Sequence, residues 1–284
     1  MVSVLRTPSG MQSLSSPEPA ASMFSGDPPG LHYVEHNRGH TTIILIHGAF
    51  VFGGYWDLVI PYLSSYHLIV PDLPGHGKSQ EITPFSVELS ADLIADLIRA
   101  HANGPAHIIG HSLGSHVAIR LASKEPELVK SIFISGFEIF PKTALTPYIP
   151  YAAWVVPRVE NCLPRPLMRW AMDGADLPRT DTSTCTLDLC RQIVSSGTPN
   201  EWPSPWPARS LIVAAGKGGL IPTSDHPHDA VKLMNLGREL NLETTAYTHK
   251  SMRHPWNRQA PQVFAETAQA WFEHKELPEG FIKL

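Results

Sequence analysis

The pentapeptide Gly110-His111-Ser112-Leu113-Gly114 holds the side chain with the clearest chemical potential in this sequence. An apolar run at residues 106–109 precedes it and a helix-like run at residues 115–122 follows it. A strand, a sharp turn and a helix would therefore meet at Ser112. The two glycines remove Cβ atoms that would clash in such a turn, so the hydroxyl can stand exposed at a helix N-terminus. This is how a protein presents a nucleophilic serine, although a serine that only caps a helix also fits the pentapeptide.

Strands and helices alternate along most of the chain around this turn. The expected strands are residues 31–36, 41–46, 66–70, 106–109, 131–135, 210–215 and 244–248. The expected helices are residues 56–63, 83–102, 115–122, 229–240 and 261–274. This alternation predicts an α/β fold with a mostly parallel, doubly wound sheet.

Residues 141–207 interrupt the alternation. They contain four of the seven tryptophans and eleven of the 27 prolines, without a clear strand. We expect a helical lid inserted into a core made of residues 31–140 and 208–284, with apolar side chains lining a pocket. The tryptophans could instead pack a small core of the lid itself. Residues 1–30 are rich in Ser, Pro, Gly and Ala and are expected to form a disordered tail.

Composition excludes several classes of partner. The net charge is −4 and charged residues make up 17% of the chain, so we expect no basic face for nucleic acid or anionic lipid. No apolar run is long enough to span a membrane, and we expect no secretory signal in the first thirty residues. Three cysteines clustered in the lid do not form a disulfide framework or a zinc site. We expect a cytoplasmic protein that acts on a small molecule without metal or organic cofactor; its oligomeric state stays open.

Four motifs occur in a characteristic order along the expected elements. They are His47-Gly48, Asp72-x-x-Gly75-x-Gly77-x-Ser79, Gly110-x-Ser112-x-Gly114 and a late histidine, His254. On these motifs the chain resembles the α/β-hydrolase superfamily from about residue 31 to residue 272, apart from the lid. The resemblance implies the α/β-hydrolase fold and a serine nucleophile.

The resemblance also implies an oxyanion hole. A serine hydroxyl attacking a carbonyl produces an oxyanion, which preorganised donors must stabilise. In this superfamily the donors are backbone N–H groups. Here one would come from Leu113 and one from Ala49 or Phe50, while His47 would shape the loop that carries the second donor.

The general base implied by the resemblance is His254. It follows the last core strand and precedes the C-terminal helix, as the superfamily requires. His249 is the rival, but it follows the strand too closely to reach across to Ser112.

The acid that should orient this histidine is missing from its usual place. Most of the superfamily carries an aspartate directly after the strand expected at residues 210–215. Here residues 216–222 read Gly-Lys-Gly-Gly-Leu-Ile-Pro. Glu138, which follows the preceding strand, is the preferred substitute. Asp225 is the alternative, although its position also resembles a helix cap, and a Ser-His pair without an acid is a further possibility.

Three functions fit these residues. The favoured one is a serine hydrolase that cleaves a small, largely apolar ester, lactone or thioester through an acyl-enzyme on Ser112. The second is a non-hydrolytic lyase, cyclase or isomerase that uses the same Ser/His pocket, since a changed acid can accompany changed chemistry. The third is a ligand-binding protein on a disabled hydrolase fold. Haloalkane dehalogenase and epoxide hydrolase reactions are disfavoured because they would need aspartate in place of Ser112.

Overall fold

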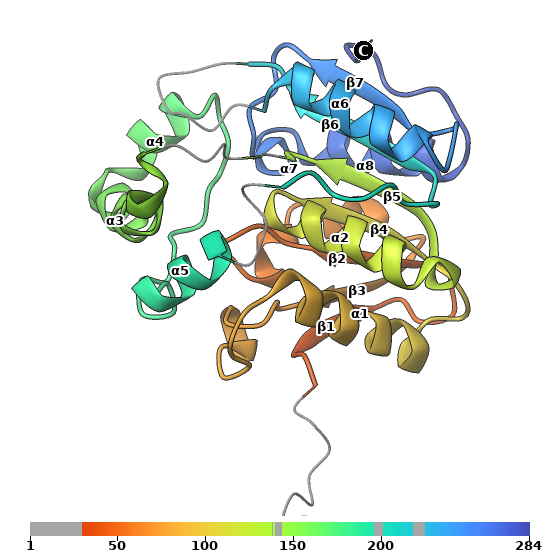
Figure 1. Cartoon of the computed structure of the whole chain (residues 1–284). Helices are drawn as coiled ribbons and strands as arrows, with labels where there is room; N and C mark the ends of the chain where they lie inside the picture. Colours follow the sequence, from red (N-terminus) through yellow and green to blue (C-terminus); the bar gives the residue numbers. More distant parts are fainter. Residues whose placement is uncertain (1–29, 138, 140–143, 196–200, 218–224) are drawn as a thin grey trace, which may run out of the picture. The chain divides into compact units, whose positions relative to one another are not determined.

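An eight-stranded sheet organises residues 31–284 in the computed structural model (Figure 1). The structure describes residues 30–137, 139, 144–195, 201–217 and 225–284, so nearly all of the expected tail lies outside it. The strands are β1 (Tyr33–His36), β2 (Thr42–Ile46), β3 (His67–Pro71), β4 (Ala106–His111), β5 (Val129–Ser135), β6 (Ser210–Ala215), β7 (Thr245–His249) and β8 (Ile282–Lys283). Their order is β1-β3-β2-β4-β5-β6-β7-β8. The pairs β1/β3 and β7/β8 are antiparallel and the pairs between them are parallel.

Helices cover both faces of this sheet, which confirms the predicted fold class. One face carries α1 (Val87–His101), α2 (Leu113–Lys124) and α6 (Pro227–Arg238). The other carries α7 (Trp256–Gln259), α8 (Pro261–Phe272) and the 3-10 turns η1 (Gly53–Trp56) and η2 (Ile60–Leu63). Further 3-10 turns are η3 (Gly77–Ser79) and η4 (Pro126–Leu128). The prediction of one helix at residues 56–63 was wrong, because Pro61 starts a new short turn there.

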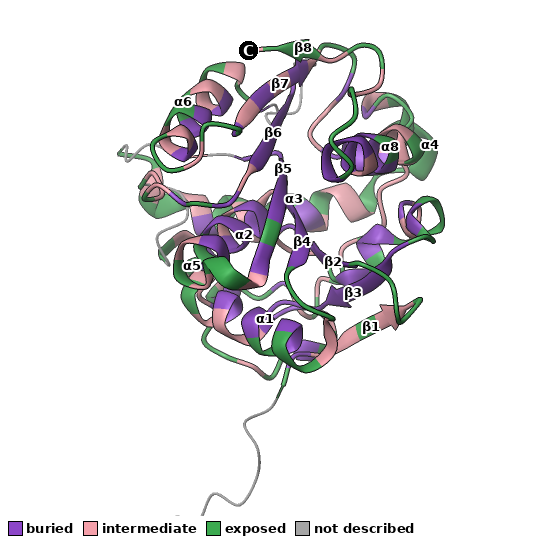
Figure 2. Cartoon of the chain, turned by 90° about the vertical axis from the view of Figure 1, so that its right-hand side faces the viewer, coloured by how far each residue is buried: buried purple, intermediate pink, exposed green. Residues whose placement is uncertain are grey.

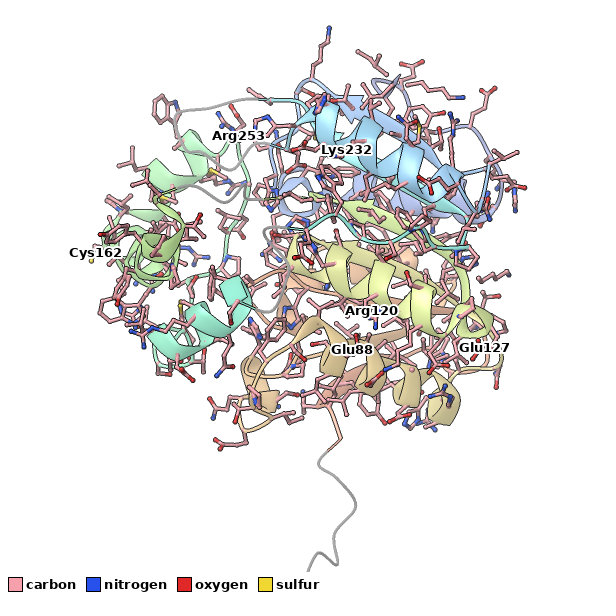
Figure 3. All side chains as sticks on the ribbon, in the orientation of Figure 1. Glu88, Arg120, Glu127, Cys162, Lys232 and Arg253 are labelled. Atoms are coloured by element: carbon pink, nitrogen blue, oxygen red, sulfur yellow. The ribbon has the colours of Figure 1, made fainter. Side chains whose placement is uncertain are left out.

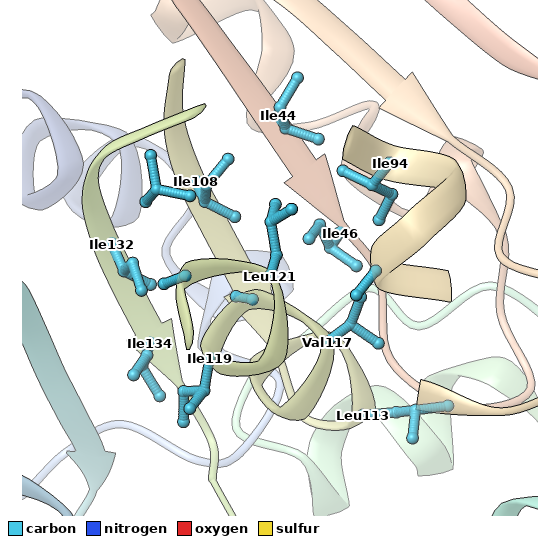
Figure 4. Packing of buried hydrophobic residues seen from close by; sticks show 14 of the residues in the cluster. Ile44, Ile46, Ile94, Ile108, Leu113, Val117, Ile119, Leu121, Ile132 and Ile134 are labelled. Carbon is cyan, nitrogen blue, oxygen red and sulfur yellow. The ribbon is translucent and has the colours of Figure 1, made fainter. Parts of the chain in front are cut away.

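The central strands are buried on both faces because their side chains alternate between two apolar clusters. Ile44, Ile108 and Ile132 pack under α1 and α2 (Figure 4). Their neighbours in sequence, such as Ile43 and Phe133, pack under α8 and η2. Figure 2 shows the buried strands between the two helical layers. This explains why strands such as β2 read as continuously apolar.

Residues 144–195 lie in the chain between β5 and β6 and contain no strand. Their elements are η5 (Thr146–Tyr148), α3 (Ile149–Cys162), α4 (Arg165–Ala171) and α5 (Leu187–Ser195). These helices group beside the sheet (Figure 1), and α3 contacts α5. Several polar contacts tie the segment to the core, among them two hydrogen bonds between Asp176 and Arg258. Gln192 accepts a hydrogen bond from the Phe85 N–H at 2.7 Å. Asp173 pairs with Lys217 at 2.9 Å and with Arg253, which is labelled in Figure 3.

Asp72 fixes the two loops that follow β2 and β3. Its buried carboxylate accepts hydrogen bonds from the N–H groups of Gly53 at 2.7 Å and Lys78 at 2.9 Å. Gly77 has φ +50°, and a Cβ there would lie 2.5 Å from the Asp72 Oδ2. The glycine therefore lets the backbone wrap around the carboxylate.

His47 joins the same two loops as a neutral side chain. Its Nε2 accepts a hydrogen bond from the Leu73 N–H at 2.9 Å, so the proton lies on Nδ1, which donates to the Gly48 carbonyl at 2.7 Å. The His76 ring packs edge-on against it at 5.2 Å. Burial lowers the pKa of His47 to about 4 and the pKa of His76 to about 3. The loop that follows β2 is thus held by uncharged imidazoles.

The apolar layer under α2 gives a first prediction. Leu121→Ala should lower the free energy of unfolding by about 2–5 kcal/mol, because it leaves a cavity in a fully buried site. Leu242→Ala, at a side chain that is 83% exposed, is the matched control and should change it by at most about 0.5 kcal/mol. Urea denaturation measures both. Equal losses in the two variants would show that α2 is not part of the cooperative core.

The buried histidines give a second prediction. Burial lowers the pKa of His107 to about 3, as it lowers those of His47 and His76. In the unfolded chain all three histidines accept protons near the ordinary pKa of 6.5. Between that value and about pH 4 the unfolded state binds more protons, so the free energy of unfolding falls as the pH drops. At pH 5.5 each histidine accounts for about 1.4 kcal/mol of this loss.

Urea denaturation of His107→Gln at pH 7.5 and pH 5.5 tests the assignment, because this ring packs on Phe272 away from the loops that follow β2 and β3. In this variant the free energy of unfolding should differ less between pH 7.5 and pH 5.5, by about 1.4 kcal/mol. His228→Gln, at a side chain that is 88% exposed, should keep the full difference. If the His107→Gln protein loses as much stability as the wild type between pH 7.5 and pH 5.5, the contribution assigned to buried His107 is wrong.

Candidate active site

Ser112 occupies a strained turn between β4 and α2. Its φ is +52° and its ψ is −118°, a backbone conformation that residues other than glycine rarely adopt. The Ser112 N–H donates to the Ser135 carbonyl oxygen at 2.8 Å, which ties the turn to the neighbouring strand β5. The side chain stands at the N-terminus of α2 and lines a cavity.

The flanking glycines are sterically required. A Cβ at Gly110 would lie 2.5 Å from the Gly114 carbonyl oxygen, and a Cβ at Gly114 would overlap the Ile46 carbonyl oxygen. Both contacts are with backbone, which cannot move aside as a flexible side chain can. The turn therefore depends on close backbone approach at both positions.

The predicted oxyanion donors lie on two sides of Ser112. Leu113 is the first residue of α2, and the first N–H groups of a helix have no acceptor within it. Ala49 and Phe50 follow β2 and line the same cavity as Ser112. Phe50 has φ +62°, and a Cβ at Gly48 would lie only 3.2 Å from the Ser112 Cβ. The structure thus brings both backbone segments against the serine.

His254 lies on the loop after β7 and lines the cavity with Ser112. Its ring packs on the backbone of Gly136, where an added Cβ would lie 2.7 Å from the ring Cε1. Its Nδ1 lies 2.5 Å from the Asp225 Oδ1. The rival base, His249, packs instead against Phe281 at 5.0 Å.

Asp225 is a buried carboxylate held at two points. Its Oδ2 accepts a hydrogen bond from the Ala215 N–H at 2.9 Å, and its Oδ1 faces His254. The helix-cap interpretation does not describe it, since the residue at the N-cap of α6 is His226. Sequence reasoning preferred Glu138, which lies outside the described residues. The signal for Asp225 was its place after β6, ten residues beyond Ala215 rather than directly after the strand.

His111 is a neighbour of the site whose role the pentapeptide left open. Its buried ring stacks on Tyr55 at 5.6 Å and lies 4.8 Å from the His254 ring. Burial, and then the nearby His254, lower its pKa well below the usual value. His111 therefore packs against His254 as an uncharged ring.

The cavity has a volume of about 920 Å³ and lies between the core loops and residues 149–180. The core contributes Ser112, His254, Ala49 and Phe50, and α3 contributes apolar residues that include Ala152, Ala153, Val156 and Pro157. Within the described part of the chain, no group of three or more His, Cys, Asp or Glu is placed to hold a metal ion. Nor is any described helix long and apolar enough to cross a membrane.

Comparison with known proteins agrees with this architecture. A model of the alpha/beta hydrolase family matches residues 43–273. An AB hydrolase superfamily protein from Gibberella zeae is 35% identical over 255 residues, which is 88% of this chain and 86% of that protein. A pimeloyl-[acyl-carrier protein] methyl ester esterase from Methylococcus capsulatus is 25% identical over 61% of this chain and 76% of its own.

Similarity to solved structures concerns the fold. A thermophilic esterase from Thermogutta terrifontis superimposes with a TM-score of 0.66 at 16% identity, over 86% of this chain and 93% of the other. The match of the family model over most of the sequence and the 35% identity over most of a relative establish the family. This chain is an enzyme of the alpha/beta hydrolase family.

Proposed function

We propose that the protein is a serine hydrolase that cleaves a small, largely apolar carboxylic ester or thioester through an acyl-enzyme on Ser112. The observation that carries the proposal is the His254–Asp225 contact of 2.5 Å in the cavity that Ser112 lines. A base held by a buried carboxylate, next to a serine on a strained turn, is the arrangement that activates a hydroxyl. The relative from Methylococcus capsulatus is named for ester cleavage, which supports this reaction class.

The chemistry follows from the positions of the groups. Ser112 Oγ attacks the carbonyl carbon while His254 accepts its proton on Nε2, because Nδ1 is engaged by Asp225. The N–H groups of Leu113 and of Ala49 or Phe50 stabilise the oxyanion. Collapse of the tetrahedral intermediate breaks the bond to the alcohol or thiol, which leaves with the proton from His254. Water, deprotonated by His254, then attacks the acyl-enzyme and releases the acid and Ser112.

We assign the acid of this triad to Asp225 in place of Glu138. A carboxylate within hydrogen-bond distance of Nδ1 holds the imidazole in the tautomer that leaves Nε2 free to accept a proton. It also stabilises the imidazolium that forms. The non-hydrolytic alternative drew on the apparent lack of an acid, and the Asp225 carboxylate beside His254 removes that reason.

We assign residues 141–207 as a lid that sets substrate choice. Its described helices α3 and α4 supply much of the cavity wall, and Asp173 ties it to Arg253 beside the base. Apolar residues such as Ala152, Val156 and Met172 suit an apolar acyl chain.

Labelling with a fluorophosphonate probe tests the nucleophile. The wild-type protein should be labelled once, on Ser112, because this serine lines the same cavity as His254, the proposed base. Ser112→Ala should abolish labelling, whereas Ser251→Ala, at an exposed serine outside the cavity, should keep it. Intact-protein mass spectrometry gives the answer. A folded wild-type protein that stays unlabelled would contradict an acyl-enzyme on Ser112.

Hydrolysis of p-nitrophenyl butyrate tests the acid. Asp225→Asn should lower kcat on the order of 10⁴-fold, because an amide no longer holds the correct tautomer of His254. Glu138→Gln should change kcat by no more than a few fold. The reverse result, a large loss in Glu138→Gln and a small one in Asp225→Asn, would restore Glu138 as the acid.

A further inference from the structure

Three arginines line the active-site cavity from the lid. Arg165 and Arg169 lie one turn apart on α4, and Arg179 follows in the segment before α5. All three are exposed, so their guanidinium groups are open to solvent. The chain as a whole carries a net charge of −4, so this concentration of positive charge is local.

Two of these arginines lack an opposite charge. Arg165 lies 3.6 Å from Asp176, which also lines the cavity. The guanidinium groups of Arg169 and Arg179 make no hydrogen bond or ion pair with any residue that the structure describes. Like charges at i and i+4 destabilise an isolated helix. The pair on α4 therefore opposes folding slightly unless something else offsets its charge.

The carboxylates that line the cavity do not neutralise the positive charge of Arg169 and Arg179. Asp176 is shared with Arg165, and Glu160 is the other carboxylate of the lining. Burial raises the pKa of Glu160, which favours its uncharged form. Among the residues that the structure describes, Glu160 forms no ion pair with Arg169 or Arg179, which leaves these two arginines available to an anion.

We propose that Arg169 and Arg179, assisted by Arg165, form an anion subsite that binds a carboxylate or phosphate group of the substrate, away from the scissile carbonyl. The inference rests on the proposed hydrolase function and deepens it. Guanidinium groups bind both kinds of oxyanion in a bidentate manner. The methionines of the same lining, Met168 and Met172, are suited to an apolar chain between the two ends of such a substrate.

The test compares esters that differ in one distant charge. The substrates are p-nitrophenyl butyrate and the mono-p-nitrophenyl esters of glutaric, adipic and suberic acid, which carry a free carboxylate. The wild-type protein should give a higher kcat/KM for at least one anionic ester than for the neutral one. The double variant Arg169→Gln/Arg179→Gln should lower that ratio by about 10- to 100-fold, mainly through KM.

Arg191→Gln is the matched control, because Arg191 is exposed on α5, contacts Tyr151 and lies outside the cavity lining. It should keep the wild-type ratio. Inhibition of p-nitrophenyl butyrate hydrolysis by glutarate and by methyl phosphate distinguishes the two anions: stronger inhibition by one of them, lost in the double variant, identifies the group bound.

Two outcomes would overturn the subsite. One is hydrolysis of the neutral and anionic esters with equal kcat/KM by the wild-type protein. The other is a ratio that the double variant leaves unchanged. In both, the neutral ester is still cleaved and the proposed function stands. If the proposed serine hydrolase function were wrong, the result would differ: no ester would be hydrolysed and Ser112 would not react with the fluorophosphonate.

Discussion

The site depends on backbone approaching backbone at Ser112. The end of β4 and the start of α2 meet there with no room for a Cβ at Gly110 or Gly114, and the latter lies against the carbonyl of Ile46 on β2. The serine can therefore adopt its strained φ only because three segments of the core hold the turn from different sides. The same constraint places the first N–H of α2 and the loop after β2 on either side of one hydroxyl. The proposed nucleophile and oxyanion donors are thus positioned by a single packing requirement.

Buried polar groups stabilise the loops around this turn. Asp72 accepts backbone N–H groups of both neighbouring loops, and His47 bridges them in one tautomer. The uncharged His47 imidazole can be buried here at little cost because both of its ring nitrogens make hydrogen bonds. His111 extends this layer behind His254. Asp225 is the carboxylate that lies within hydrogen-bond distance of the His254 ring.

The core and the proposed lid differ in how they are stabilised. The central strands pack two apolar layers that bury almost every side chain, whereas α3 and α4 expose large residues such as Tyr151, Val159 and Trp170. Polar ties, including Gln192 to Phe85 and Asp173 to Arg253, connect the lid to the core. The residues of α3 and α4 that line the cavity lie outside the turn at Ser112, so they can vary without disturbing it. This separation is consistent with substrate selection in the lid and chemistry in the core.

The sequence by itself determined the fold class, the strands of the central sheet and the turn at Ser112, because these follow from local periodicity and from glycine spacing. It did not predict β8, a two-residue edge strand stabilised only by its partner β7, nor the division of residues 53–63 into two 3-10 turns. Tertiary structure alone placed a carboxylate beside His254. Asp225, ten residues beyond Ala215, contacts that ring while its carboxylate accepts a hydrogen bond from a backbone N–H of β6. Such a contact depends on how distant segments pack in space, which no spacing along the chain encodes.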